Sequence, residues 1–174
     1  MTNDGSTQHR SAPDDPFPRS RLSTDPYGLP PREPNPYASW FKRVGAYLID
    51  ALLVTVAYFP AFIGLIVSAS GGNGAVSTSL IVIGALVSLA VLIWNTCLRA
   101  GRTGYSIGKG VLGIKLVGDD SRTPIGPGKA LLRYLLHIVD ALPLYLGYLW
   151  PLWDAKRQTF SDKIMHTVVL NEPQ

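Results

Sequence analysis

The sequence predicts an all-α integral membrane protein, a bundle of three to four transmembrane helices with a small cytoplasmic β element and a disordered N-terminal tail. Two long apolar runs are the main reason. Residues 44–69 contain one charged side chain, Asp50, and residues 76–98 contain none. About 20 consecutive apolar residues suffice to cross the hydrocarbon core of a bilayer. Charged residues make up 16% of the chain, less than the ~25% typical of soluble domains.

Residues 1–37 predict a disordered cytoplasmic tail, and residues 38–171 predict the transmembrane domain. Eight of the fourteen prolines lie in residues 1–39, among polar side chains and with almost no aliphatic ones. Such a segment cannot bury enough apolar surface to offset the entropy that it would lose on ordering. Two functions are open for this tail, namely a docking arm for a protein partner or a solvated tether.

Aromatic and basic residues predict where the first helix enters the membrane. Tyr37, Trp40 and Phe41 fit the belt of aromatic side chains at the level of the lipid headgroups. Lys42 and Arg43 follow directly, and basic residues at the end of a transmembrane helix mark its cytoplasmic side. The N-terminus is therefore expected in the cytoplasm.

The first helix is expected to run to about Ala69, with Ser39 as its N-cap and a kink at Pro60. The loop 70–75 carries no positive charge, which places it outside the cell. The second helix, residues 76–98, would then return to the cytoplasm.

A basic stretch follows, with seven Lys or Arg residues in 99–133, and it is expected in the cytoplasm. Residues 113–125 alternate loosely between apolar and polar side chains, which predicts a small β-hairpin with its turn at 119–122. Residues 166–170 also have strand character, and they could pair with residues 113–118.

Residues 130–153 form a third apolar segment, for which two readings are open. As a helix, the uncharged part 141–153 would be only ~20 Å long, shorter than a ~30 Å hydrocarbon core. In one reading the segment is a single span that puts the C-terminus outside. In the other it breaks at Pro143 into two shorter helices that return to the cytoplasm. The basic residues within 156–163 favour the second reading.

Asp50 is the residue of greatest functional interest, because a carboxylate inside a membrane helix is costly and needs a partner or a polar path. Arg43 precedes it by seven residues, or two helical turns, and lies on nearly the same face. Two roles are open. The residues could form a structural ion pair that fixes helix packing, or Asp50 could carry protons or cations with Arg43 beside it.

Arg133, His137 and Asp140 repeat this spacing on one helical stripe. If their helix faced the first one, a single polar cluster would hold two arginines, two acids and a histidine, and His137 would carry protons near neutral pH. In the plainer interpretation, Arg133 reaches out to the interface and His137 is a hydrogen-bonded buried residue. Asp162 is expected to pair with Arg43, to cap backbone amides or to remain a solvated turn residue.

Other motifs do not predict an enzyme. Residues 108–113 match GxGxxG, but no strand precedes them, so nucleotide binding is not expected and the glycines are interpreted as turn formers. Cys97 is the only cysteine, which excludes an internal disulfide and a multi-cysteine metal site. Because no Ser/His/Asp or zinc-ligand spacing occurs, no cofactor or metal is expected. The basic residues flank the apolar runs, so nucleic-acid binding is not expected either.

Three runs occur in a characteristic order, namely FKRVGAYLIDALLV, TGYSIGKGVLGIKLV and RQTFSDKIMHTVVL. They resemble the RDD family of small bacterial membrane proteins, over about residues 38–171. The resemblance implies that the arginine and two aspartates for which the family is named are Arg43, Asp50 and Asp162. The Pro-rich tail is similar to that of actinobacterial members. The resemblance also implies a role in transport, which for some members has been suggested to be sodium/proton exchange.

The leading hypothesis from the sequence is therefore transport of protons, cations or small solutes through a polar cluster around Asp50. Three or four helices are few for a transporter, so this function would require a homo-oligomer. The alternative is a non-catalytic membrane adaptor or assembly factor that recruits a protein partner through its Pro-rich tail. In both cases the chain is expected to cross the cell membrane several times, with the lipid bilayer as its main partner.

Overall fold

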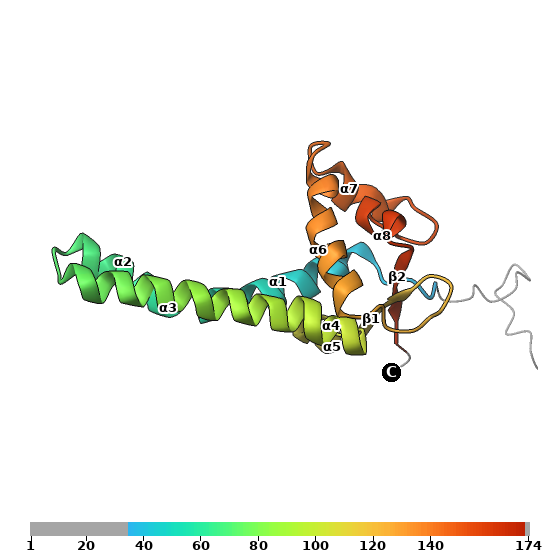
Figure 1. Ribbon diagram of the computed structural model, residues 1–174. Helices are drawn as coiled ribbons and strands as arrows, with labels where there is room; N and C mark the ends of the chain where they lie inside the picture. The colour runs from blue at the N-terminus through green and yellow to red at the C-terminus, as the bar shows by residue number, and fades with distance from the viewer. Residues whose placement is uncertain (1–34, 173–174) are drawn as a thin grey trace, which may run out of the picture. The chain divides into compact units, whose positions relative to one another are not determined.

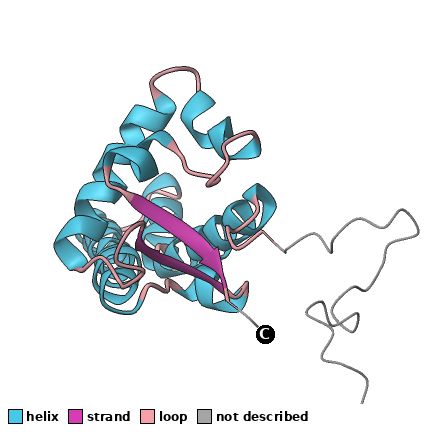
Figure 2. Ribbon diagram, turned by 90° about the vertical axis from the view of Figure 1, so that its right-hand side faces the viewer, coloured by secondary structure: helices cyan, strands magenta, loops and turns pink. Residues whose placement is uncertain are grey.

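The computed structural model describes residues 35–172, which form a mostly helical unit with one two-stranded sheet (Figures 1 and 2). Most of the predicted disordered tail lies outside the described residues. The elements in chain order are α1 Trp40–Ala57, α2 Phe59–Ala69, α3 Gly74–Leu92, the π-helix η2 Ile93–Arg99, α4 Ala100–Thr103, α5 Ile107–Val111, β1 Ile114–Gly118, α6 Pro127–Ala141, α7 Leu146–Leu149, the 3-10 helix η3 Trp150–Leu152, α8 Phe160–Ile164 and β2 Thr167–Asn171.

The first apolar run folds as two helices joined by a bend. Ser39 Oγ accepts a hydrogen bond from Lys42 N and caps α1, as predicted. The chain bends by 49° between α1 and α2 at Tyr58. Pro60 lies in the first turn of α2, where its missing N–H costs nothing, but it cannot continue the hydrogen bonds of α1. The predicted kink at Pro60 is therefore confirmed.

The second apolar run forms one continuous helix of 30 residues through α3, η2 and α4, long and apolar enough to cross a membrane. Asn73 caps it by accepting hydrogen bonds from Ala75 N and Val76 N. Helix α2 packs along α3 (Figure 1). The helices come so close that a Cβ atom on Gly84 would lie 2.3 Å from Ala61 N. We call α1–α2 and the helix from α3 to α4 the membrane hairpin.

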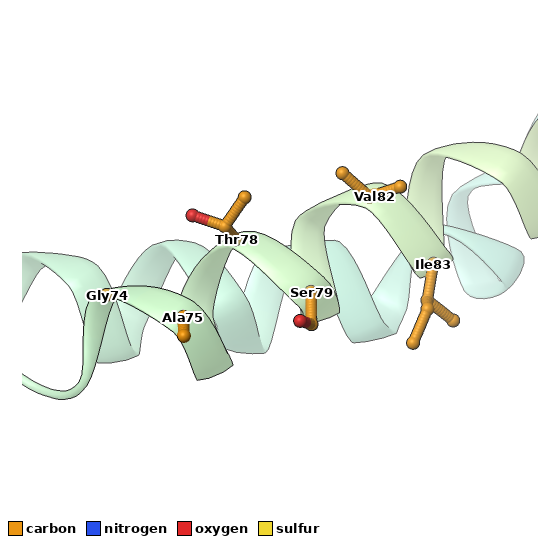
Figure 3. Close-up of a pocket in the computed structure, with 6 residues that line it drawn as sticks. All are labelled: Gly74, Ala75, Thr78, Ser79, Val82 and Ile83. Atoms are coloured by element: carbon orange, nitrogen blue, oxygen red, sulfur yellow. The ribbon is translucent and has the colours of Figure 1, made fainter.

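A shallow hollow lies on the exposed side of α3, near its first turns. Figure 3 shows its small and apolar side chains along one stretch of the helix, Gly74, Ala75, Thr78, Ser79, Val82 and Ile83. It contains no charged group and lies far along the hairpin from Asp50. This hollow therefore adds nothing to the candidate site.

The small sheet is built differently from the prediction. Strand β1 pairs with β2 in antiparallel register, from Ile114 opposite Asn171 to Gly118 opposite Thr167. The predicted turn after β1 exists, because Arg122 N donates to Gly118 O, but the predicted hairpin around it is wrong. The partner of β1 is the C-terminal strand β2, and not the residues that follow the turn. The pairing of the two predicted strand segments is confirmed, and it buries Ile114 together with Val169 in the core of the sheet.

Residues 35–38 join this sheet on the free side of β2. Ala38 N donates to Val169 O (2.8 Å), and Asn171 N donates to Pro36 O (2.7 Å). The side chain of Asn171 donates to the carbonyl oxygens of Asn35 and Tyr37, both at 3.2 Å. The segment that leads into α1 is thus held beside the last strand.

The third apolar segment breaks, as the second reading predicted. Helix α6 ends at Ala141, and the helical chain resumes at Leu146 after a bend of 107°. Because β2 pairs with β1, the chain returns after α6–η3 to the strand that precedes α6. Neither α1 nor α6 is by itself long and apolar enough to cross a membrane. Each could do so only together with the helices that follow its bend, α2 after α1 and α7–η3 after α6.

Candidate functional site

Three polar clusters lie where α1, η2, α5, α6 and α8 meet, at the end of the membrane hairpin next to the sheet. Each is named here by its acid, as the Asp50, Asp162 and Asp140 clusters. Helix α6 runs across the end of the hairpin instead of alongside α1 (Figure 1), and it packs against η2 and α4. For this reason the polar stripes of α1 and α6 meet only at their arginine ends.

The Asp50 carboxylate is buried and accepts three hydrogen bonds. Its Oδ1 accepts from Asn95 Nδ2 (2.7 Å) and from Gly108 N (2.8 Å), and its Oδ2 accepts from Ser106 Oγ (2.6 Å). Helix α5 approaches α1 closely, since a Cβ atom on Gly108 would lie 2.0 Å from Ala46 O. The glycine is therefore required for the backbone contact with Asp50.

Asn95 connects this cluster to the 30-residue helix that runs from α3 to α4. It lies in the π-helix η2 and is fully buried. While its amide nitrogen donates to Asp50, its Oδ1 accepts from Ile107 N (2.8 Å). π-helical turns are uncommon and often occur at functional positions. The side chain thus joins α1, η2 and the start of α5.

Lys109 is the only basic side chain beside the Asp50 cluster that the structure places within hydrogen-bonding reach. Its Nζ lies 3.4 Å from Ser106 Oγ, which in turn contacts Asp50. Burial and, to a smaller extent, the charge of Arg133 lower the pKa of Lys109 to about 8, although the charge of Asp50 offsets part of this effect. The charge of Lys109 therefore changes much closer to neutral pH than that of an ordinary lysine.

We expect Lys109→Met to stabilise the protein at pH 7 by roughly 1–2 kcal/mol, because the folded state then no longer holds a charge that burial disfavours. In the wild type, the unfolded chain binds more protons at Lys109 than the folded chain between about pH 8 and 10.5, so stability should rise with pH in this window. Thermal unfolding in detergent over pH 7–10.5 measures both effects. The exposed Lys129→Met is the control, and a rise that persists unchanged in Lys109→Met would contradict this assignment.

The Asp162 cluster is a buried ion network. Arg43 Nη1 donates to Asp162 Oδ2 (2.7 Å), and Arg133 Nε donates to Oδ1 (2.7 Å). Arg133 Nη2 also lies 2.7 Å from Oδ1 as part of the ion pair. Thr167 Oγ1 also donates to Oδ1 at 3.0 Å, and the same carboxylate caps α8 by accepting from Thr159 N. Burial raises the pKa of Asp162, but the charges of Arg133 and Arg43 lower it more, so it lies well below the usual range.

These contacts correct two predictions and confirm one. The predicted pairing of Asp162 with Arg43 is confirmed, together with its capping role. The predicted pair between Arg43 and Asp50 is wrong, because seven helical residues span about 10 Å along the axis, and Arg43 finds Asp162 instead. Arg133 does not reach out to the interface, since it joins the same carboxylate.

The Asp140 cluster ties α8 to the far end of α6. Asp140 Oδ2 lies 2.6 Å from His137 Nδ1 and accepts a hydrogen bond from Ser161 Oγ at 2.6 Å, while Oδ1 accepts from Ser161 N at 3.1 Å. Ser161 Oγ also contacts His137 Nδ1 at 2.9 Å. In a catalytic triad, serine and aspartate bind opposite nitrogens of the histidine. Here they share one nitrogen and Ser161 is fully buried, so the arrangement is structural.

The predicted single cluster of two arginines, two acids and a histidine does not form among the described residues. Asp50 and Asp140 belong to separate clusters, and the arginines converge on Asp162. Within residues 35–172, no three His, Cys, Asp or Glu side chains gather as a metal site. Sequence reasoning missed the partners of Asp50, although Asn95 is a polar residue near the end of an apolar run and Ser106 has the spacing of a cap for α5.

Comparisons with known proteins give a family match and two named relatives. The model of the RDD family matches residues 37–166. A "Proline-rich antigen" of Mycobacterium leprae is 36% identical over 154 residues, which cover 77% of this chain and 61% of that protein. A "Proline-rich antigen homolog" of Mycobacterium tuberculosis is 52% identical over 80 residues, 46% of this chain and 33% of that protein. The chain thus spans less than two thirds of either relative's length. No significant match to a solved structure was found.

Proposed function

This chain belongs to the RDD family of membrane proteins, and we propose that it acts as a membrane adaptor that presents its Pro-rich N-terminal segment to a protein partner. The observation that carries this proposal is the anchoring of residues 35–38. The backbone of Pro36 and Ala38 bonds to β2, and Arg157 Nη1 donates to Tyr37 O (3.0 Å). The root of the Pro-rich segment is thereby fixed to a sheet that the ion network joins to the membrane hairpin.

The state of the acids supports an adaptor over a carrier. Asp140 and Asp162 are fully buried, and their oxygens are held by hydrogen bonds and ion pairs. These contacts stabilise the packing of the helices and leave the two carboxylates little room to bind and release a transported ion. Beyond Asp50, residues 51–98 contain no charged side chain. Ala61 and Gly84 are also in close contact between α2 and α3. A charge crossing the described unit would find few polar groups along the hairpin.

The names of the relatives point in the same direction. Both relatives are named for their proline content, and this chain concentrates eight of its fourteen prolines in residues 1–39. Proline-rich segments bind partners well, because their extended conformation is preformed and loses little entropy on binding. A segment of this composition on a fixed root suits recruitment to the membrane.

The test compares the full-length chain with a deletion of residues 1–34, which keeps the contacts of residues 35–38 with β2. Both are purified from membranes after in-cell cross-linking, beside a variant in which the prolines of residues 1–34 are changed to serine. We expect a stoichiometric partner with the wild type that is lost in both variants, while membrane abundance stays unchanged. An identical set of cross-linked proteins in all three samples would overturn the proposal.

A second candidate, proton or cation transfer, is favoured by one observation. A carboxylate offers about four acceptor positions, and Asp50 uses three, which leaves one on Oδ2. Lys109, with its lowered pKa, lies next to it through Ser106. Flux of sodium, potassium and protons in proteoliposomes decides this candidate. Flux that Asp50→Asn removes while insertion is unchanged would establish transport.

A further inference from the structure

Helix α6 has its polar side toward the protein and its apolar side toward the surroundings. The inward side carries Arg133, His137 and Asp140, all held by contacts described above. The outward side carries exposed apolar residues at helical spacing, Leu131 (44% exposed), Leu135 (59%), Ile138 (64%) and Leu142 (74%). This is the reverse of a surface helix in a soluble protein, whose apolar stripe faces the core.

The apolar surface continues past the bend. The residues that follow α6 include exposed leucines and aromatics, Leu144 (87% exposed), Tyr145 (66%), Leu146 (48%), Leu152 (53%) and Trp153 (57%). Soluble monomers rarely expose so continuous an apolar patch. Tyrosine and tryptophan in such a patch are typical of the level of the lipid headgroups.

The segment is nevertheless too short and too bent to cross a bilayer. Helix α6 has 15 residues, or about 22 Å, against a ~30 Å hydrocarbon core. The chain then turns by 107° into α7 and η3. Figure 1 shows α6 running across the axis of the membrane hairpin, and β2 brings the chain back to β1 on the same side.

Two contacts fix the height of this segment relative to the hairpin. Trp40 Nε1 donates to Tyr148 O (2.9 Å), which ties α7 to the aromatic entry of α1. Gly126 N donates to Gly101 O (2.8 Å), which ties the start of α6 to the end of the 30-residue helix. The segment therefore lies at the level where the hairpin enters and leaves the membrane.

Charge supports a lipid occupant. Arg102 and Lys129 flank the start of α6, and both are exposed. Basic side chains beside an apolar helix are attracted to anionic headgroups. The start of α1 is also apolar and exposed, since Phe41 is 75% exposed, so a second protein chain on α6 alone would leave that surface uncovered.

We propose that α6–η3 lies in the plane of the membrane, with the outward face of α6 buried at the boundary between headgroups and acyl chains. The leaflet is the one at which α1 begins. The chain then crosses the membrane only through its hairpin. This inference does not depend on the adaptor proposal, because it concerns how the domain sits in lipid.

The test measures depth in vesicles of phosphatidylethanolamine and phosphatidylglycerol. Single cysteines carrying an environment-sensitive fluorophore are placed in full-length Cys97→Ala protein. Leu135→Cys and Ile138→Cys report on the outward face of α6, Leu86→Cys on the middle of α3, and Ser121→Cys on the exposed turn after β1. Lipids with a quencher near the headgroup or deep in the acyl chain are added. We expect the α6 labels to be quenched more by the shallow quencher, the α3 label more by the deep one, and the turn label by neither.

Sidedness gives the second measurement. Leu144→Cys, between α6 and α7, should not react with a membrane-impermeant maleimide added on the side opposite to the one from which Ser121→Cys reacts. Reaction from the opposite side, or quenching of the α6 labels at the depth of the α3 label, would show that the segment crosses and would overturn the proposal. α6 labels that stay unquenched until the protein is diluted in lipid would instead show a second copy on this face and would also overturn it.

Discussion

Replacing Asp162 by asparagine is expected to destabilise the described unit strongly. Two arginines converge on this fully buried carboxylate, and the change leaves both without a counter-charge. Removing one partner of a buried charge network typically costs about 3–5 kcal/mol. We expect Asp162→Asn to lower the melting temperature in detergent strongly and to reduce the amount of protein in the membrane.

Asp120→Asn is the matched control, because Asp120 is exposed in the turn after β1 and should leave the melting temperature unchanged. Wild-type stability in Asp162→Asn would refute the structural role of the network. Acid supplies an independent check. Since the folded-state pKa of Asp162 lies below the unfolded value, its contribution is complete above about pH 4 and is lost only as pH falls further. Stability attributable to Asp162 should therefore be constant between pH 5 and 7.

The second large effect is expected at Asp50, where two substitutions should behave differently. Asp50→Leu leaves the donors of Asn95, Ser106 and Gly108 without an acceptor, and each buried unsatisfied donor costs about 1–3 kcal/mol. Asp50→Asn should cost far less. Both fixed donors meet Oδ1, which asparagine keeps, and the Ser106 hydroxyl that meets Oδ2 can rotate to accept from the new amide.

Thermal unfolding and membrane abundance of the two variants measure this difference. A loss as severe in Asp50→Asn as in Asp50→Leu would show that the charge, not the hydrogen-bonding pattern, holds the cluster. Because Asp50→Asn is expected to fold, it is also the suitable variant for the flux measurement. Asp50→Leu is not, since lost flux there could result from lost fold.

Local patterns in the sequence were sufficient to predict the long helices, but not the short helices α5 and α8. The uncharged run up to Leu98 predicted a continuous second helix, and Ser39 and Pro60 predicted the cap and the bend of the first. Pro143 likewise predicted the break after α6. These features depend on neighbours in the chain, because caps, missing N–H groups and apolar length act within a few residues.

Long-range partners were predicted less well. Strand pairing and the Arg43–Asp162 pair were foreseen, because complementary segments and charges were few. The partners of Asp50 were not predicted. Asn95 and Ser106 lie 45 and 56 residues away in sequence, and neither side chain is charged, so nothing in the sequence marked them as partners of a carboxylate. The pair between Arg43 and Asp50 failed for a geometric reason. A shared helical face does not bring side chains two turns apart into contact, while a helix lying across the end of α1 does bring Arg133 and Asp162 to Arg43.

The position of β2 between β1 and residues 35–38 has a consequence for biogenesis. The ribosome makes β2 after every other element of the described unit, and the acid that binds both arginines comes only shortly before it. The hairpin can enter the membrane while these partners are still being synthesised. During this interval Arg43 and Arg133 have no counter-charge, and the free edge of β1 is open to other strands. Chaperones and membrane proteases would meet the nascent chain in that state. A delay in the synthesis of β2 should therefore lower the amount of folded protein, even where the finished protein is stable.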